Sequence, residues 1–374
     1  MANPVVAPWE LDPEGDVLLT LHNPNAPFAV WDEYWYRKQI FSFWGQLVTE
    51  PQKSEPAKAT PQTQTEATSE KKQGLPIPDQ PTSSKPKVQF LLSSKHLSLS
   101  SGYFKNLLRG PWKEATPTSP DGRLCVDAED WDENSLLLLM RIIHGHNFKV
   151  PKSMTLEEIA KVAVLVDYYQ CHEAVMVWSD VWIDKIPNPI PNPDENAFNR
   201  DTILWILVAQ VFRKEQSFRN ATLAAIQYCK GRFPTLGLPI TAVADRIDKE
   251  REKLLGQVFT CVYDLLKRLR RQQVGCSFAC SSMMLGALSI QLHQLGIFEP
   301  QLYPPYPRYC YVIAISIMLN IATPEWMVVP QLTYAPFTIQ NHACTLWHFL
   351  SPMLINKAKG IELADIQGEG VKMV

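Results

Sequence analysis

The chain has 374 residues, of which 46% are hydrophobic and 10% aromatic, and such globular values predict about two domains with buried cores. A formal net charge of −2 argues against bulk electrostatic attraction to nucleic acid or to an anionic membrane surface. Because the first residues lack the pattern of a signal peptide and the longest apolar run is too short to cross a bilayer, we expect a cytoplasmic or nuclear protein with eight reduced cysteines.

The first predicted element is a strand followed by a long insertion. An aliphatic run at 15–21, an Asn- and Pro-rich turn at 22–27 and a second apolar run at 28–31 are typical of a hairpin, or of one strand with a wide loop. Residues 46–87 contain seven prolines and no aromatic residue, so they offer little apolar area to offset the entropy of ordering. We therefore predict a disordered insertion between two strands of one sheet.

A second strand and a capped helix follow the insertion. Residues 88–92 are mostly apolar and predict the strand, after which Ser100 or Ser101 is placed to cap a helix. The apolar residues of this helix recur at helical spacing and share one face. They are Tyr103, Phe104, Leu107 and Leu108.

A third strand and a buried helix come next. Residues 123–126 predict the strand, and either Asp132 or Asn134 can cap a helix at 135–144. This helix is apolar almost all round, which is typical of a helix that is covered on most sides.

The next two helices end at a Pro-rich segment. Thr155 and Glu158 have the spacing of a capping box at the start of one helix, and residues 173–186 predict another. The sequence PNPIPNPD at 187–194 cannot remain helical and marks the clearest boundary. Beyond it we find helical patterns only, at 202–212, 217–229, 241–272, 278–295, 309–321 and near the C-terminus.

Several motifs in the first half match those of a known interaction module. Asp16 precedes the first strand, and residues 97–104 have the pattern Leu-x3-Ser-x-Tyr-Phe at the turn into the first helix. The later segments LLLLMRIIHG and EEIAKVAVLVDYYQC correspond to its following helices. With these motifs the chain resembles the BTB/POZ domain, although Ser93 replaces a usual His and Ile143 a usual Tyr. Its overall layout resembles the fungal BTB-domain proteins that have a helical C-terminal region.

From this resemblance we predict an α+β fold in three parts. A BTB/POZ module, in which helices surround a small sheet, occupies residues 14–186 and carries the disordered insertion at 46–87. A Pro-rich linker follows at 187–200, and an all-α C-terminal domain completes the chain at 201–374.

The resemblance implies a non-enzymatic adaptor or scaffold that binds other proteins. It implies homodimerisation through the first helix and the adjoining strand, and docking to a cullin-type ubiquitin-ligase scaffold with the C-terminal domain as the partner surface. The expected interaction residues are Tyr103, Phe104, Leu107 and Leu108. Three alternatives stay open: a dimeric nuclear co-regulator, a structural scaffold unrelated to ubiquitin, and an enzyme with its site in the helical domain.

The motifs of the common catalytic sites do not occur in the sequence. We find no Gly-rich phosphate loop, HExxH, G-x-S-x-G or paired CxxC, and we expect no catalytic residue and no cofactor. His144 and His146 fit a helix terminus better than a metal site. The basic run at 267–271 fits a solvated helix end, where it faces the negative end of the macrodipole, better than a nucleic-acid contact.

One group of cysteines has the composition of a zinc site. Cys276 and Cys280 share one helix face, and His342 with Cys344 could complete a Cys3His tetrahedron. Structural zinc sites usually take a ligand pair from a tight knuckle rather than from a helix. Our prediction is therefore that Cys276, Cys280 and Cys344 are reduced thiols without metal.

Overall fold

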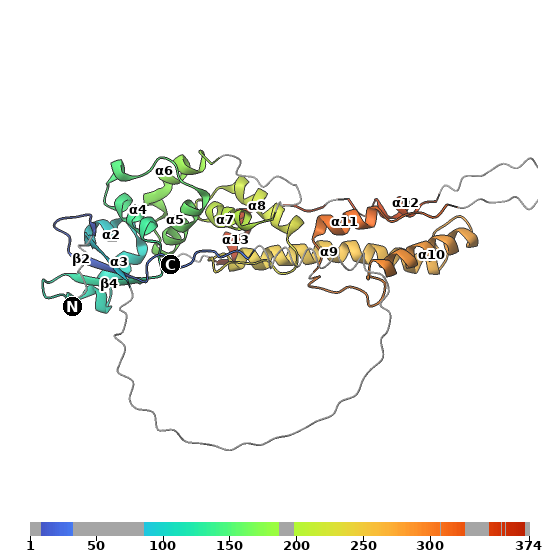
Figure 1. The fold of residues 1–374 in the computed structure, drawn as a ribbon, viewed down its shortest axis with the longest axis horizontal. Helices are drawn as coiled ribbons and strands as arrows, with labels where there is room; N and C mark the ends of the chain where they lie inside the picture. Colours follow the sequence, from blue (N-terminus) through green and yellow to red (C-terminus); the bar gives the residue numbers. More distant parts are fainter. Residues whose placement is uncertain are drawn as a thin grey trace, which may run out of the picture.

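The computed structural model describes residues 9–32, 86–186, 198–306, 308–325, 344–352, 354–355 and 357–370. Within these ranges the chain forms twelve α-helices, two short 3-10 helices and one four-stranded sheet. The molecule is elongated, with the sheet at one end and helices α10 and α12 at the other (Figure 1). The predicted α+β class is confirmed.

The sheet is built around strand β2, which lies between β3 and β4. Its strands are β1 (Trp9–Glu10), β2 (Val17–His22), β3 (Lys87–Leu92) and β4 (Leu124–Glu129), in the order β1-β3-β2-β4. Strand β2 pairs antiparallel with β3 and parallel with β4, so Leu19 lies between Phe90 and Val126. The three inward-facing residues of β2 are fully buried, as the alternation of a half-covered strand requires.

The structure corrects two details of the predicted strands. Residues 28–31 form no strand, so the hairpin across the Asn- and Pro-rich turn is wrong, and β2 takes β3 as its antiparallel partner instead. Lys87, placed at the end of the insertion, is the first residue of β3. The rest of the predicted insertion, except Pro86, lies outside the described residues.

Five helices complete the N-terminal part. They are α2 (Ser94–Ser100), α3 (Gly102–Arg109), α4 (Glu133–Ile143), α5 (Leu156–Tyr169) and α6 (His172–Ile183), with 3-10 turns at Lys113–Ala115 and Asn147–Lys149. Of the alternative caps, Ser101 accepts a hydrogen bond from the backbone of Phe104, and Asp132 accepts one from the backbone of Ser135. The capping box of Thr155 and Glu158 is confirmed. Helix α4 is buried on nearly every side.

The remaining helices pack along one long helix. Helix α9 (Thr241–Arg270) has 30 residues, and α8, α10, α11 and α12 all contact it. Their bounds, with those of α7 and α13, are α7 Arg200–Val211, α8 Glu215–Tyr228, α10 Phe278–Gln294, α11 Tyr311–Leu319, α12 Leu346–Leu350 and α13 Leu363–Gly370. No helix within the described ranges has both the length and the apolar character needed to cross a membrane.

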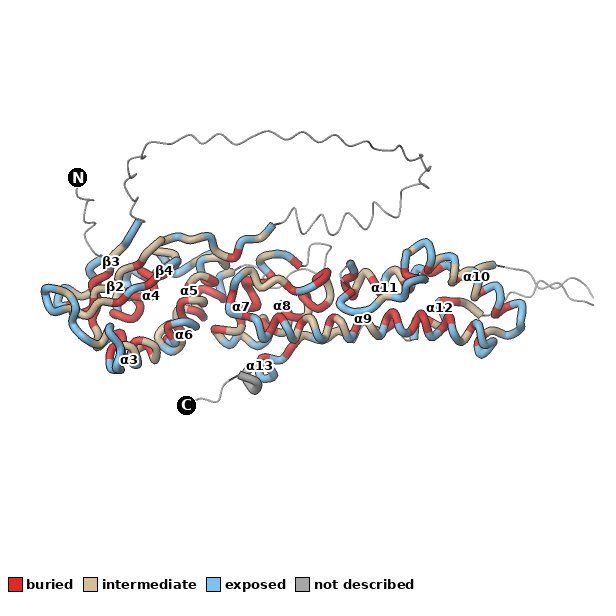
Figure 2. The backbone as a smooth tube through the Cα atoms, turned by 90° about the horizontal axis from the view of Figure 1, so that it is seen from below, coloured by how far each residue is buried: buried red, intermediate tan, exposed pale blue. Residues whose placement is uncertain are grey.

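The hydrophobic core continues from the sheet into these helices. Helix α7 is buried almost all round and packs against α5, and buried residues run on through α8 and α9 (Figure 2). Arg200, at the end of the predicted linker, is the first residue of α7 and pairs with Glu157 of α5 at 2.8 Å. It also donates to the backbone oxygens of Phe28 and Ala29. The other linker residues apart from Phe198 and Asn199 lie outside the described residues.

Candidate functional site

The start of helix α3 is fixed to the end of helix α5. The Ser101 hydroxyl donates to the backbone oxygen of Tyr169 at 2.5 Å, and the backbone N–H of Gly102 donates to Gln170. A side chain at Gly102 would bring its Cβ within 2.9 Å of the Gln170 amide oxygen. Since Ser101 also caps α3, one residue sets both the beginning of the helix and its position on α5.

An aromatic cluster forms where these helices meet. Phe104 stacks on Tyr169 with ring centroids 4.8 Å apart and an interplanar angle of 11°, and both rings are buried. Tyr168 is 47% exposed, and its ring centroid lies within 5.3 Å of the ring centroids of both Tyr103 and Trp131. Burial, together with the hydrogen bond and charge of Tyr168, raises the pKa of Tyr103 to about 12. The inner half of the cluster is core and the outer half is surface.

An apolar set at α3, which we call the α3 stripe, is made of Tyr103 and Leu107 on the helix and of Trp112 just after its end. Tyr103 and Leu107 are one helical turn apart and half-buried. Trp112 is 58% exposed and lies over Gly110 at the end of the helix, where an added Cβ would be 2.7 Å from the indole ring. A row of this kind with Tyr and Trp is typical of a protein-binding surface.

The four sequence-predicted interaction residues therefore divide into two pairs. Phe104 and Leu108 are buried in the core, where no partner can contact them, while Tyr103 and Leu107 reach the surface. Sequence reasoning missed Trp112 and Tyr168. No signal in the sequence decides which of the adjacent tyrosines Tyr168 and Tyr169 reaches the surface, because neighbouring pairs of α5 such as Leu165 and Val166 are both buried.

If the protein were an enzyme with its site in the helical domain, its catalytic polar groups would be expected in a cleft beside α9. It has a volume of about 710 Å3 and its wall carries charged residues of α9, including Asp248. Burial raises the pKa of Asp248, and its carboxylate accepts a hydrogen bond from the backbone of Phe233 at 2.9 Å. Arg251 is fully buried nearby and donates to the backbone of Pro305 at 3.0 Å. These bonds hold the segments of Phe233 and Pro305 against α9, while the Nε and Nη1 atoms of Arg251 have no hydrogen-bond partner among the described residues.

The histidine pair is not arranged for a metal. The ring of His144 is buried, its Nε2 accepts from the backbone of Ser93 at 3.0 Å, and its Nδ1 lies 2.8 Å from the Met140 carbonyl. Burial lowers the pKa of His144, which keeps the ring neutral. With both nitrogens occupied by backbone groups, this residue joins α4 to the segment that leads into α2.

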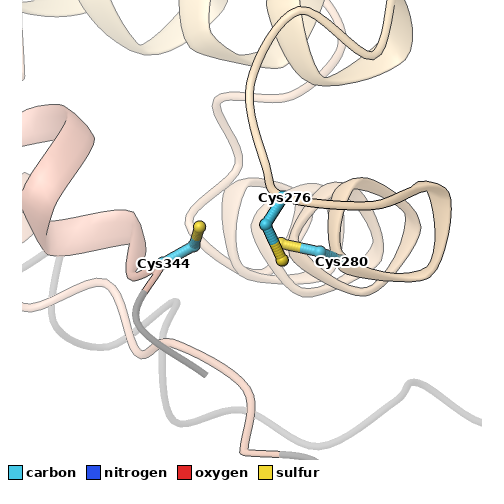
Figure 3. Close-up of side chains that lie close together, drawn as sticks. All are labelled: Cys276, Cys280 and Cys344. Atoms are coloured by element: carbon cyan, nitrogen blue, oxygen red, sulfur yellow. The ribbon is translucent and has the colours of Figure 1, made fainter. Parts of the chain in front are cut away.

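Three cysteines lie together at the end of the molecule opposite the sheet. The Sγ atoms of Cys276, Cys280 and Cys344 are all within 4.8 Å of one another. Figure 3 shows Cys276 and Cys280 side by side where α10 begins, with Cys344 approaching from the segment before α12. All eight cysteines are in the described part of the chain, and none forms a disulfide. His342, the fourth member of the predicted set, lies outside the described residues.

Comparisons with known proteins do not assign the chain to a family. No family model, no curated protein and no solved structure matches it. The BTB/POZ assignment therefore stays a prediction that depends on the sequence motifs and on the order of the elements.

Proposed function

We propose that this protein is a non-enzymatic adaptor or scaffold of the BTB/POZ type. The observation that carries the proposal is the α3 stripe, in which half-buried Tyr103 and Leu107 of α3 and exposed Trp112 beyond its end offer apolar surface. Two hydrogen bonds hold this helix against α5. The element order supports the family assignment: an antiparallel strand pair, helices α2 and α3, a strand parallel to the first, and the helices α4 to α6. This is the order that the resemblance implied, with α2 as an additional helix.

The partner that we assign to the α3 stripe is a second copy of this chain. A two-fold interface brings the same patch of both subunits together, so it must be complementary to itself. The α3 stripe can face its own copy without charge repulsion, because Leu107 and Trp112 are apolar and a tyrosine such as Tyr103 is uncharged at physiological pH. The BTB/POZ resemblance implies pairing through the same helix.

The experiment is light scattering on the purified chain and on two variants. We expect a mass of about 85 kDa, twice the 42.5 kDa chain mass, for the unaltered protein at tens of micromolar. Changing Leu107→Asp together with Trp112→Ser should return the mass of one chain. Phe148→Ser is the matched control, because Phe148 is fully exposed outside the α3 stripe, and it should remain dimeric. A single-chain mass for the unaltered protein would refute the dimer.

We further propose that the adaptor docks to a cullin-type ubiquitin-ligase scaffold and presents partners on its C-terminal helices. Helix α10 supports a partner surface there, because its large side chains Phe278, Met283 and Ile290 are exposed. Affinity purification followed by mass spectrometry should recover a cullin with the unaltered protein. Recovery of chromatin proteins instead would favour the nuclear co-regulator, and recovery of neither would favour a scaffold unrelated to ubiquitin.

A further inference from the structure

We propose that Cys276, Cys280 and Cys344 bind one Zn²⁺ ion as thiolates and thereby join the start of α10 to α12. This reverses the metal-free state expected from the sequence. The site lies at the end of the molecule opposite the α3 stripe, so it is independent of the proposed dimer (Figure 1).

The positions of the sulfur atoms fit a shared ion. Zinc holds thiolates at about 2.3 Å in a tetrahedron, which places neighbouring sulfurs roughly 3.8 Å apart. All three Sγ atoms already lie within 4.8 Å of one another, so small side-chain rotations close the site. A disulfide would join only two of the three sulfurs and would leave the approach of the third unexplained.

The turn before α10 is shaped to bring Cys276 back over Cys280. Gly275 has a φ of +96°, and a Cβ at that position would lie 2.7 Å from the Ser281 hydroxyl oxygen and 3.1 Å from the Cys280 sulfur. Ser277 caps α10 by accepting a hydrogen bond from the backbone of Cys280, and Ser281 donates to the backbone of Val274 at 2.7 Å. These bonds set the two thiols side by side at the start of α10.

Cys344 comes from a distant part of the sequence and is held by separate contacts. The backbone N–H of Leu346 donates to the Thr323 hydroxyl at 2.9 Å, which ties the start of α12 to the residues after α11. Leu346 and Leu350 are buried, and α12 contacts both α9 and α11. Helix α12 has only five residues and gains little stability from its own hydrogen bonds. An ion shared with α10 supplies the additional constraint.

The ligand set determines the class of ion. Three thiolates favour a soft or borderline metal such as zinc over magnesium or calcium, which bind oxygen. Cys276 is exposed, so an ion can enter from solvent. Three protein ligands leave the fourth position of the tetrahedron to a ligand outside this set.

The test is metal analysis of the full chain, purified under reducing conditions with zinc present and then dialysed. We expect about one equivalent of zinc by plasma emission, as one tetrahedral site requires. Replacing zinc with Co²⁺ should give thiolate-to-cobalt charge-transfer absorption and the visible bands of a tetrahedral ion.

Two variants and a control separate the site from general folding. Cys276→Ser changes an exposed residue, so the fold should persist. The zinc affinity should fall more than ~100-fold, because the loss of a metal ligand costs more than the loss of a residue that only contacts a ligand. Cys344→Ser should act in the same way. Cys125 is a half-buried cysteine outside the cluster, so the Cys125→Ser variant should still bind about one equivalent of zinc. A folded, reduced protein that takes up no zinc, or that keeps its zinc in both cluster variants, would overturn the proposal.

Discussion

Phe104 allows the placement of α3 on α5 to be tested by a change in stability. Its side chain is fully buried and stacks on Tyr169, so Phe104→Ala removes both buried area and an aromatic pair. Truncating a packed phenylalanine costs about 3–5 kcal/mol of unfolding free energy, and because this side chain also loses an aromatic pair we expect the upper half of that range. Phe104→Leu keeps most of the volume and should cost about 1–2 kcal/mol.

The measurement is urea unfolding followed by far-ultraviolet circular dichroism and by tryptophan fluorescence. Phe148→Ala is the control, since a fully exposed ring away from special contacts should change stability by less than about 0.5 kcal/mol. An unfolding free energy that increases from Phe104→Ala to Phe104→Leu to the unaltered protein would identify a packing effect. If Phe104→Ala cost less than about 0.5 kcal/mol, α3 would not pack on α5 as described.

Three further outcomes are expected. Deleting residues 46–85 and joining the ends with a short Gly/Ser loop should leave the melting temperature nearly unchanged, because closure entropy varies only slowly with loop length; a large decrease would contradict the prediction. Asp16→Ala should cost about 1 kcal/mol at pH 7, because Asp16 accepts from the backbone and hydroxyl of Ser94 at the start of α2. Partial burial by itself raises the pKa of Asp16, but the two hydrogen bonds outweigh it and lower this pKa. The difference in unfolding free energy between the variant and the unaltered protein should therefore persist above pH ~4 and shrink as the pH falls through the lowered pKa of Asp16. A difference that does not change with pH would refute this prediction. Arg200→Met should cost roughly 1.5–3 kcal/mol in a denaturation experiment, because it removes a charged bond to Glu157 and two backbone contacts, whereas an unchanged midpoint would show that α7 is held without them.

The elements that depend on local patterns could be predicted from the sequence. The box at Thr155 was predicted outright, and each cap was narrowed to two candidates, Ser100 or Ser101 and Asp132 or Asn134. These signals use residues three positions apart, so they lie within one short window. Helix α9 was expected at 241–272 and runs from 241 to 270, because its apolar stripe continues for many turns. Both the helix caps and the long amphipathic helix are determined by residues close together in the sequence.

Helix α2 could not be predicted in this way. Its sequence, SKHLSLS, is polar, and its first backbone N–H is accepted by Asp16, a residue 78 positions earlier. The partner of strand β2 was likewise set by a long-range pairing rather than by the turn that follows it. In both cases the stabilising group is distant in sequence, and for α2 the local propensity alone favours a loop.

The candidate sites show the same division. The sequence placed Cys276 and Cys280 on one helix face, but Cys276 lies in the turn before α10. The approach of Cys344 depends on how α12 packs on α9 and α11. The spacing of Phe104 and Leu108 was visible too, but the exposure of Trp112 depends on the turn after α3. Sequence therefore identified the three cysteines of one site but only Tyr103 and Leu107 of the other, because tertiary packing decides which side chains reach the surface.

The continuous core has a consequence for an adaptor. Helix α9, with 30 residues, is about 45 Å long at 1.5 Å per residue, and it reaches from α8 to the thiol cluster. At its other end the chain connects to the α3 stripe through α7 and α5, which pack against each other and share the Arg200–Glu157 ion pair. Buried side chains along this whole route resist bending, because close-packed interiors deform little. A partner bound near α10 would therefore be held at a defined distance from a partner bound at the α3 stripe, which is the geometric requirement of a scaffold.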